Sequence, residues 1–171
     1  MMIRGLNTAR LFAMTLALAG GLVAGCGGES SDGAFVTSVT HQPDGTTSEK
    51  TSWLTSDELA KMDGERTALA ALGGTGAAPS LDTGCAGASM WIFDGGSQTG
   101  NRICFAGTGT DNLASYTAPG GGNWSQKAKS FWGGVYSASF RMLPSHSFLT
   151  ADPWARGDFF TLVDLLKQPA F

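Results

Sequence analysis

The chain has 171 residues, a formal net charge of −3 at pH 7 and three cysteines. This length suits one domain with additional segments. Its basic residues are scattered and form no evident patch, as illustrated by Lys127, Lys129, Arg141 and Arg156. An acidic chain without a basic patch is a poor candidate for nucleic-acid binding, so we expect no nucleic-acid partner.

The N-terminal segment has the features of an export signal. Arg4 and Arg10 are followed by the apolar, small-residue run Leu11–Gly25. This run is shorter than the roughly 20 apolar residues that a transmembrane helix needs. Residues 1–25 are therefore predicted to form a secretory signal peptide.

The end of this signal, Leu22-Val23-Ala24-Gly25-Cys26, resembles a bacterial lipobox: an aliphatic residue and two small residues before a cysteine. The resemblance implies that Cys26 is acylated and becomes the mature N-terminus, so lipid anchors the chain to a membrane without spanning it. Gly27, in place of aspartate, implies the outer membrane. We therefore expect an exported lipoprotein of the bacterial cell envelope. The alternative is an ordinary signal peptide that happens to end near a cysteine.

The two remaining cysteines, Cys85 and Cys104, are most simply paired in a disulfide, because the chain is predicted to be exported. The bond would close a loop of about 20 residues and stabilise the fold by roughly 3 kcal/mol. A metal site is the weaker alternative, since two cysteines without a nearby histidine supply only half of a zinc coordination sphere.

After a polar tether over residues 26–33, residues 34–73 are predicted to form a hairpin followed by a helix. Two Thr/Val-rich runs flank Gln42-Pro43-Asp44-Gly45, which suits a type I turn. Thr55 and Glu58 form a capping box at a helix start, and Leu54 can pack against Leu59. The expected helix ends at Gly73-Gly74. It carries a partial apolar stripe for packing: Leu59, Met62, Leu69 and Leu72.

Residues 74–83 are predicted to be a linker, and residues 84–171 a β domain. Short β-rich runs alternate there with turns: "SMWIFD", "NRICFAG", "SFWGG", "VYSASFRM", "SFLT" and "GDFFTLV". In the fourth run Tyr136, Ala138, Phe140 and Met142 share one face, as in a half-buried strand. Many short strands with glycine-rich turns indicate an all-β sandwich or barrel, with most tryptophans in its core.

The segment "WIFDGGSQTGNRICFAGTGTDNLASY", followed by "NWSQKAKSFWGG", resembles the βγ-crystallin superfamily, including its bacterial branch of small secreted peptidase inhibitors. The family's Greek-key motif is an aromatic, four residues, an aromatic, one residue, then glycine. Phe93 and Gly100 match its ends, whereas Gln98 occupies the middle aromatic position. A weaker second copy would run from Phe148 to Gly157. The resemblance implies a Greek-key sandwich over about half of the chain.

The family can bind calcium through a loop of amide, carboxylate and hydroxyl ligands. Aligned on Trp124 and Phe131, this chain keeps only Ser130 of that pattern, and Lys129 replaces a hydroxyl. The remaining oxygen donors, Asp94, Gln126 and Ser130, fall short of the six or more that calcium prefers. We expect no cofactor, and no calcium binding tighter than roughly millimolar.

Catalytic patterns are weak in this sequence. His146 lies between Ser145 and Ser147, but neither serine stands in a G-x-S-x-G motif, and the acidic residues are dispersed. His146 is therefore expected to be a surface residue in a turn; the chain's other histidine is His41. We expect a non-catalytic envelope lipoprotein with a structural or interaction module and an unidentified protein partner. The alternative is an inhibitor of secreted metalloproteases, although the lipid anchor disfavours it, because such inhibitors are usually released.

Overall fold

The structure is a computed structural model that describes residues 32–42, 44–73, 85 and 90–167. The predicted signal peptide, Cys26, most of the tether and the 74–83 linker lie outside these residues. The described part is mostly β-strand, with two α-helices. Its elements are β1 (Gly33–His41), β2 (Thr47–Thr55), α1 (Ser56–Ala71), β3 (Met90–Phe93), β4 (Arg102–Ala106), β5 (Thr110–Asn112), α2 (Trp124–Lys127), β6 (Ser130–Trp132), β7 (Ala138–Met142), β8 (Phe148–Ala151), β9 (Arg156–Asp158) and β10 (Val163–Lys167).

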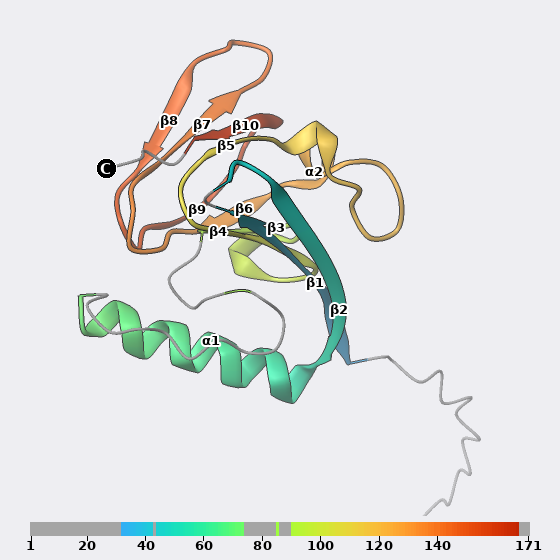
Figure 1. Cartoon of the computed structure of the whole chain (residues 1–171), viewed down its shortest axis with the longest axis vertical. Helices are drawn as coiled ribbons and strands as arrows, with labels where there is room; N and C mark the ends of the chain where they lie inside the picture. Colours follow the sequence, from blue (N-terminus) through green and yellow to red (C-terminus); the bar gives the residue numbers. More distant parts are fainter. Residues whose placement is uncertain (1–31, 43, 74–84, 86–89, 168–171) are drawn as a thin grey trace, which may run out of the picture. The chain divides into compact units, whose positions relative to one another are not determined.

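The strands form two sheets, a six-stranded one in the order β2-β1-β4-β3-β6-β9 and a four-stranded one in the order β5-β10-β7-β8 (Figure 1). The strands β3–β6 and β7–β10 form two consecutive runs of four. Each run contributes three strands to one sheet and one strand to the other sheet. The fourth strand lies beside the first, since β6 pairs with β3 and β10 with β7. The third strand crosses to the other sheet, so β5 joins β10 and β9 joins β6. The two runs therefore interlock.

The main core lies between the two sheets. Side chains that alternate along each strand meet there: Met90 and Ile92 from β3, Phe131 from β6, and Phe140 from β7 are all buried in one cluster. Ala138 is buried in the same cluster and Met142 packs against it, which confirms the predicted face from residue 138 onward, whereas Tyr136 precedes β7. Every residue of β3 is buried because this central strand is covered on both faces.

Helix α1 covers the opposite face of the six-stranded sheet (Figure 1). The predicted capping box is present: the Thr55 hydroxyl accepts a hydrogen bond from the Glu58 backbone N–H, and the Thr55 N–H donates to the Glu58 carboxylate. The hydrogen bonds that the Thr55 backbone N–H and the Thr55 hydroxyl donate to the Glu58 carboxylate hold the pKa of Glu58 below its usual value. Met62 and Leu69 are buried as predicted, but Leu72 is exposed because the helix ends there. The helix stops before Gly73, which has a φ of 70°.

The predicted hairpin is present and extends the six-stranded sheet. Strands β1 and β2 pair antiparallel, and the Gly45 N–H donates to the Gln42 carbonyl across the turn, 3.0 Å apart. Strand β1 also pairs in parallel with β4, with Val36 opposite Arg102. The hairpin is therefore built into the main sheet, beyond the local pairing that the sequence predicts.

The predicted second motif copy, Phe148 to Gly157, is wrong. Phe148 lies on the edge strand β8 with its side chain 58% exposed, and the second four-strand run begins earlier, at β7. Gly157 stands within β9 opposite Phe131, not in a turn. The run "GDFFTLV" likewise divides between β9 and β10. The hairpin from β7 to β8 contains no glycine, and its positive φ, 56°, falls on His146.

Gly157→Ala is expected to destabilise the protein by about 1–3 kcal/mol, because the new Cβ would lie 2.7 Å from Cε1 of the buried Phe131 ring. Gly64→Ala is the matched control. Gly64 lies in the interior of α1 with no atom within 4 Å of a new Cβ, so alanine should stabilise by about 0.4–1 kcal/mol. Urea unfolding of both variants measures the two effects. Equal changes in the same direction would contradict the packing described for β9.

Candidate functional site

The loop aligned with the calcium-binding pattern is short and well anchored. Its first residue, Asn123, caps the one-turn helix α2 by accepting the Gln126 backbone N–H at 3.2 Å. Trp124 is fully buried in the main core. The backbone N–H of Lys129 donates to the Phe93 carbonyl at 2.8 Å. The loop is therefore held against the core at Trp124 and against β3 at Lys129.

Ser130, the one retained position of the pattern, has a structural role. Its buried hydroxyl donates to the Gly95 carbonyl at 2.7 Å and accepts the Gln98 N–H at 2.9 Å. Both partners belong to the hairpin between β3 and β4. That hairpin folds back on itself, with positive φ angles of 61° at Gln98 and 81° at Gly100. Ser130 thus fastens the folded hairpin to the start of β6.

Asp94, the candidate carboxylate, is occupied by internal hydrogen bonds. It accepts the backbone N–H of Asn101 at 2.8 Å and the Asn101 side-chain amide at 2.7 Å. The carboxylate also approaches the backbone of Gly100 so closely that a Cβ there would collide with it. A side chain at residue 100 is excluded both by this contact and by the positive φ. Asp94 closes the hairpin and holds its shape.

Of the three candidate calcium ligands, Asp94 and Ser130 lie at the β3–β4 hairpin, and Gln126 lies away from it. Ser130 and Asp94 both bind the turn between β3 and β4, whereas the side chain of Gln126 is exposed near Gly122. Lys129 is exposed as well. Among the residues that the structure describes, no group of three or more His, Cys, Asp or Glu side chains is placed to hold a metal ion.

Ser130→Ala is expected to lower stability by about 1–3 kcal/mol, because the partly buried Gln98 N–H loses its acceptor. Thermal unfolding should show this loss equally in calcium and in chelator, since a ligand that does not bind the native state cannot stabilise it. Gln126→Ala, which removes an exposed candidate oxygen, is the control and should change little. A calcium-dependent rise of several degrees, abolished by Ser130→Ala, would instead establish a working calcium site.

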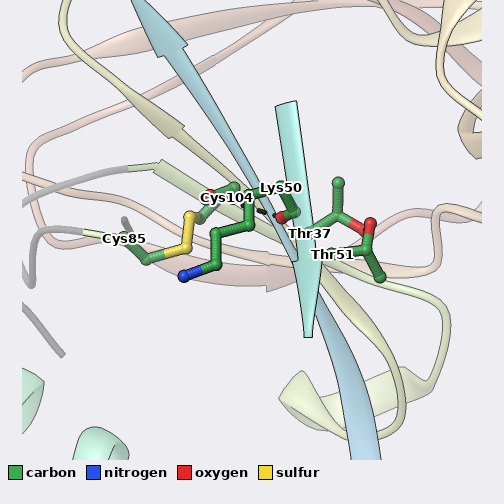
Figure 2. The surroundings of a disulfide bond; sticks show 6 residues. Thr37, Lys50, Thr51, Cys85 and Cys104 are labelled. Carbon is green, nitrogen blue, oxygen red and sulfur yellow. Dashed lines mark hydrogen bonds between the residues drawn. A yellow bond between two sulfur atoms is a disulfide. The ribbon is translucent and has the colours of Figure 1, made fainter. Parts of the chain in front are cut away.

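The face beneath α1 carries one continuous row of side chains across all six strands. Neighbouring strands place the row in register: Lys50, Ser38, Cys104, Trp91, Trp132 and Arg156. Cys104 forms the predicted disulfide with Cys85, with Cα atoms 5.9 Å apart. Figure 2 shows the bond beside the paired strands β1 and β2, with the Lys50 side chain extending toward it.

Arg66 of α1 is buried above this row, with no exposed surface. One guanidinium nitrogen donates to the carbonyls of Trp132 and Gly133, both at 2.7 Å. The guanidinium lies 4.7 Å from the ring centre of Trp91 and 5.0 Å from that of Trp132. Burial lowers the pKa of Arg66 well below its usual value, and the negative charge of Asp63 opposes that shift. Aromatic rings and carbonyls thus replace water around a buried cation.

Two further arginines stack on the same rings. Arg102 of β4 donates to Asp63 of α1 at 2.6 Å and lies 5.1 Å from the Trp91 ring centre. Arg156 of β9 lies 3.6 Å from the ring centre of Trp132. We call Arg66, Arg102, Arg156, Trp91 and Trp132 the arginine–tryptophan cluster. The cluster attaches α1 to the sheet.

The sequence did not single out this cluster, because arginine side chains are seldom fully buried in proteins. A signal for Arg66 was nevertheless available. Arg66 follows Met62 by one helical turn and precedes Leu69 by nearly one, so it lies on the same buried stripe. The positions of Arg102 and Arg156 carried no comparable local signal, because their contacts depend on strands far apart in the sequence.

His41 ends β1 and is partly buried, and its Nε2 lies 3.0 Å from the buried carboxylate of Asp111. Tyr116 donates to the other oxygen of that carboxylate at 2.6 Å. Burial, together with this bond, raises the pKa of Tyr116 above its usual value. The three side chains join the first hairpin to β5. His146 does lie exposed in a turn, as expected.

Two hollows mark the described surface, each beside exposed apolar side chains. A groove of about 300 Å³ lies between the β1–β2 hairpin and residues 117–120, with Phe35 in its wall. A second hollow of about 320 Å³ lies beside Lys129 and the loop from Phe159 to Leu162. Within that loop the Phe160 side chain is 94% exposed.

Helices offer no membrane-spanning candidate: within the described residues, none is both long and apolar enough to cross a bilayer. Comparison with known proteins adds no assignment. The chain matches no family model, no curated protein and no solved structure.

Proposed function

We propose that this protein is an exported, lipid-anchored, non-catalytic module of the bacterial cell envelope. In this proposal the module is a βγ-crystallin-like Greek-key domain that lacks a working calcium site. It stands on the outer membrane through acylated Cys26, and its role is structural or interactive. The interlocking of the two four-strand runs is the observation that carries the domain assignment.

The strand order supports a Greek-key domain for a topological reason. In a Greek key the fourth strand returns by a longer connection and lies beside the first. Both β6 beside β3 and β10 beside β7 follow that rule, and each run lends its third strand to the other sheet. The fastening of the β3–β4 hairpin by Ser130 also fits the motif residues Phe93 and Gly100.

The side chains that would form a calcium site support a structural role. Asp94 and Ser130 are engaged in hydrogen bonds that hold the folded hairpin, and Lys129 adds a positive charge to the loop. Recruiting Asp94 or Ser130 to a cation would weaken those bonds. A scaffold with stable loops is therefore the function that fits the geometry best.

Fractionation of a bacterial host tests the proposed anchoring. The wild-type chain should sediment with outer membranes and resist extraction by high salt, because acyl chains rather than charges hold it. Cys26→Ser should appear in the soluble fraction with an unchanged melting temperature. Release of the wild-type chain by salt alone, or sedimentation of both forms alike, would contradict a lipid anchor.

Inhibition of secreted metalloproteases is the second candidate, and the loop between β9 and β10 favours it. Both ends of this loop are pinned: Phe159 N–H donates to the Lys129 carbonyl, and Leu143 N–H donates to the Leu162 carbonyl, each at 2.7 Å. The Phe160 side chain projects between them. A pre-ordered loop with an exposed apolar side chain can enter an enzyme pocket at low entropic cost.

If the second function holds, the purified domain should slow thermolysin-like proteases without being cleaved, and Phe160→Ala should abolish the effect. Phe148→Ala is the matched control, since Phe148 is exposed on β8 rather than on this loop. Inhibition assays with both variants separate a loop-specific contact from general apolar binding. No inhibition across a protease panel at high micromolar concentration would remove this candidate.

A further inference from the structure

An exposed aromatic pair stands at the point where the described fold begins. Phe35 on β1 and Trp53 on β2 lie opposite each other, with ring centres 4.9 Å apart and planes at 74°. Their side chains remain 39% and 42% exposed. The Trp53 ring also packs over the backbone of Gly33, the first residue of β1. We call these two side chains the Phe35–Trp53 pair.

The pair is held by the sheet and not by a mobile turn. Phe35 N–H donates to the Asn101 side-chain oxygen at 2.9 Å, and β1 is hydrogen-bonded on both sides, to β2 and β4. The aromatic surface therefore stays presented to solvent without rearrangement. A fixed pair of aromatic rings at the protein surface is available for contact with a partner without any rearrangement of the fold.

The length of chain before β1 limits what this partner can be. Fully extended, the segment from Cys26 to Gly33 spans no more than roughly 25 Å. If Cys26 carries the lipid, as the proposed function holds, Gly33 cannot leave the neighbourhood of the bilayer surface.

We propose that the Phe35–Trp53 pair rests in the headgroup region of the membrane that holds the lipid anchor. Aromatic side chains with an apolar ring favour this region, and tryptophan also brings an indole N–H for hydrogen bonding. The anchor and the pair would together form a two-point attachment that fixes how the domain stands on the bilayer. The proposal rests on the proposed lipid anchoring and adds the face that meets the lipid.

Acidic residues at the same end of the hairpin indicate which kind of lipid headgroup the aromatic pair would meet. Asp32 precedes β1, and its carbonyl accepts the Ser56 N–H at the start of α1, whose first turn contains Asp57 and Glu58. These acidic side chains disfavour an anionic surface. The fitting partner is therefore a zwitterionic lipid surface, and its contact with the aromatic pair should be insensitive to salt.

The test attaches the mature chain to vesicles by chemistry, so that it does not depend on acylation in the cell. The chain contains three cysteines, and with Cys85 paired to Cys104 the thiol of Cys26 remains for coupling to maleimide lipid. The vesicles are phosphatidylcholine with brominated acyl chains, which quench tryptophans at the bilayer. The Trp53 signal is the emission of the wild-type chain minus that of Trp53→Phe.

On coupling to vesicles, the Trp53 emission should shift to the blue and be protected from aqueous iodide. In vesicles with brominated acyl chains, the Trp53 emission should be quenched. In Trp53→Phe carrying Phe148→Trp, the new tryptophan on β8 should keep its emission and remain open to iodide. Phosphatidylglycerol vesicles should protect Trp53 less than phosphatidylcholine vesicles do. Melting temperatures of the uncoupled variants establish that all are folded.

Iodide quenching of Trp53 that is unchanged by coupling would overturn the proposal. Equal loss of emission from the tryptophan at residue 148 would also overturn it, because the domain would then have no fixed orientation. Stronger protection by phosphatidylglycerol would contradict the zwitterionic preference. These experiments couple Cys26 to lipid chemically, so they test the aromatic contact and not the natural lipid anchor. Flotation of the native chain with membranes tests the anchor separately.

Discussion

Replacement of Arg66 by alanine is expected to destabilise the protein by roughly 3–5 kcal/mol, the range of large-to-small substitutions in protein cores. The substitution removes a fully buried side chain and leaves a cavity between Trp91 and Trp132. It also leaves the carbonyls of Trp132 and Gly133 without their donor, and each buried carbonyl so orphaned costs about 1–3 kcal/mol.

Two variants separate the contributions to this loss. Arg66→Met keeps most of the volume and should lose less than alanine does. Arg66→Lys keeps the charge, but an ammonium cannot stack as a flat guanidinium does, so it too should destabilise. Arg141→Ala, which breaks the partly exposed ion pair with Asp164, is the surface control and should change little. Chemical denaturation of the four variants measures the effects. An Arg66→Ala protein as stable as the wild type would refute the role of the arginine–tryptophan cluster.

Loss of the disulfide is expected to cost roughly 3 kcal/mol, because the bond restricts the unfolded chain over a sequence separation of 19 residues. Both cysteines are buried, and Cys104 lies in the row between Ser38 and Trp91. The double variant Cys85→Ala with Cys104→Ala, in a Cys26→Ser background, should therefore unfold at lower denaturant concentration.

Reduction of the Cys26→Ser form with a phosphine should reproduce the loss without any change of sequence. The double alanine variant should not respond to the same reductant, which makes it the control for side effects. Titration of two free thiols in the folded, oxidised Cys26→Ser form would contradict the disulfide.

Local signals in the sequence predicted the elements that form locally. The capping box at Thr55 and Glu58 and the turn before Gly45 act within a few residues, and both are present. The alternation of Ala138 and Phe140 likewise indicated a half-buried strand and is confirmed. The all-β class followed from the number of such short strands.

The interlocked sheets and the parallel pairing of β1 with β4 could not be predicted from local signals. Strand register depends on side chains that meet across long loops, and Val36 and Arg102 are far apart in the chain. The second motif copy was misplaced because its β7–β8 hairpin has His146, and not a glycine, at positive φ. The aromatic–glycine pattern therefore pointed to Phe148 and Gly157, which lie on later strands.

The candidate site was predictable in residue type but not in bonding. The sequence predicted Asp94, Gln126 and Ser130 as possible oxygen donors, and it predicted that they are too few for a calcium site. That their oxygens bind the β3–β4 hairpin follows only from its three-dimensional shape. The helical spacing of Arg66 from Met62 and Leu69 was a signal for its burial that the sequence prediction did not use.

We propose that this domain stands on a membrane through a lipid on Cys26. Mass spectrometry of the protein extracted from bacterial membranes examines that residue itself. The predicted result is a mature chain that begins at Cys26 and carries the mass of acyl chains on that residue. A mature N-terminus at any other position, or an unmodified Cys26 thiol, would contradict it.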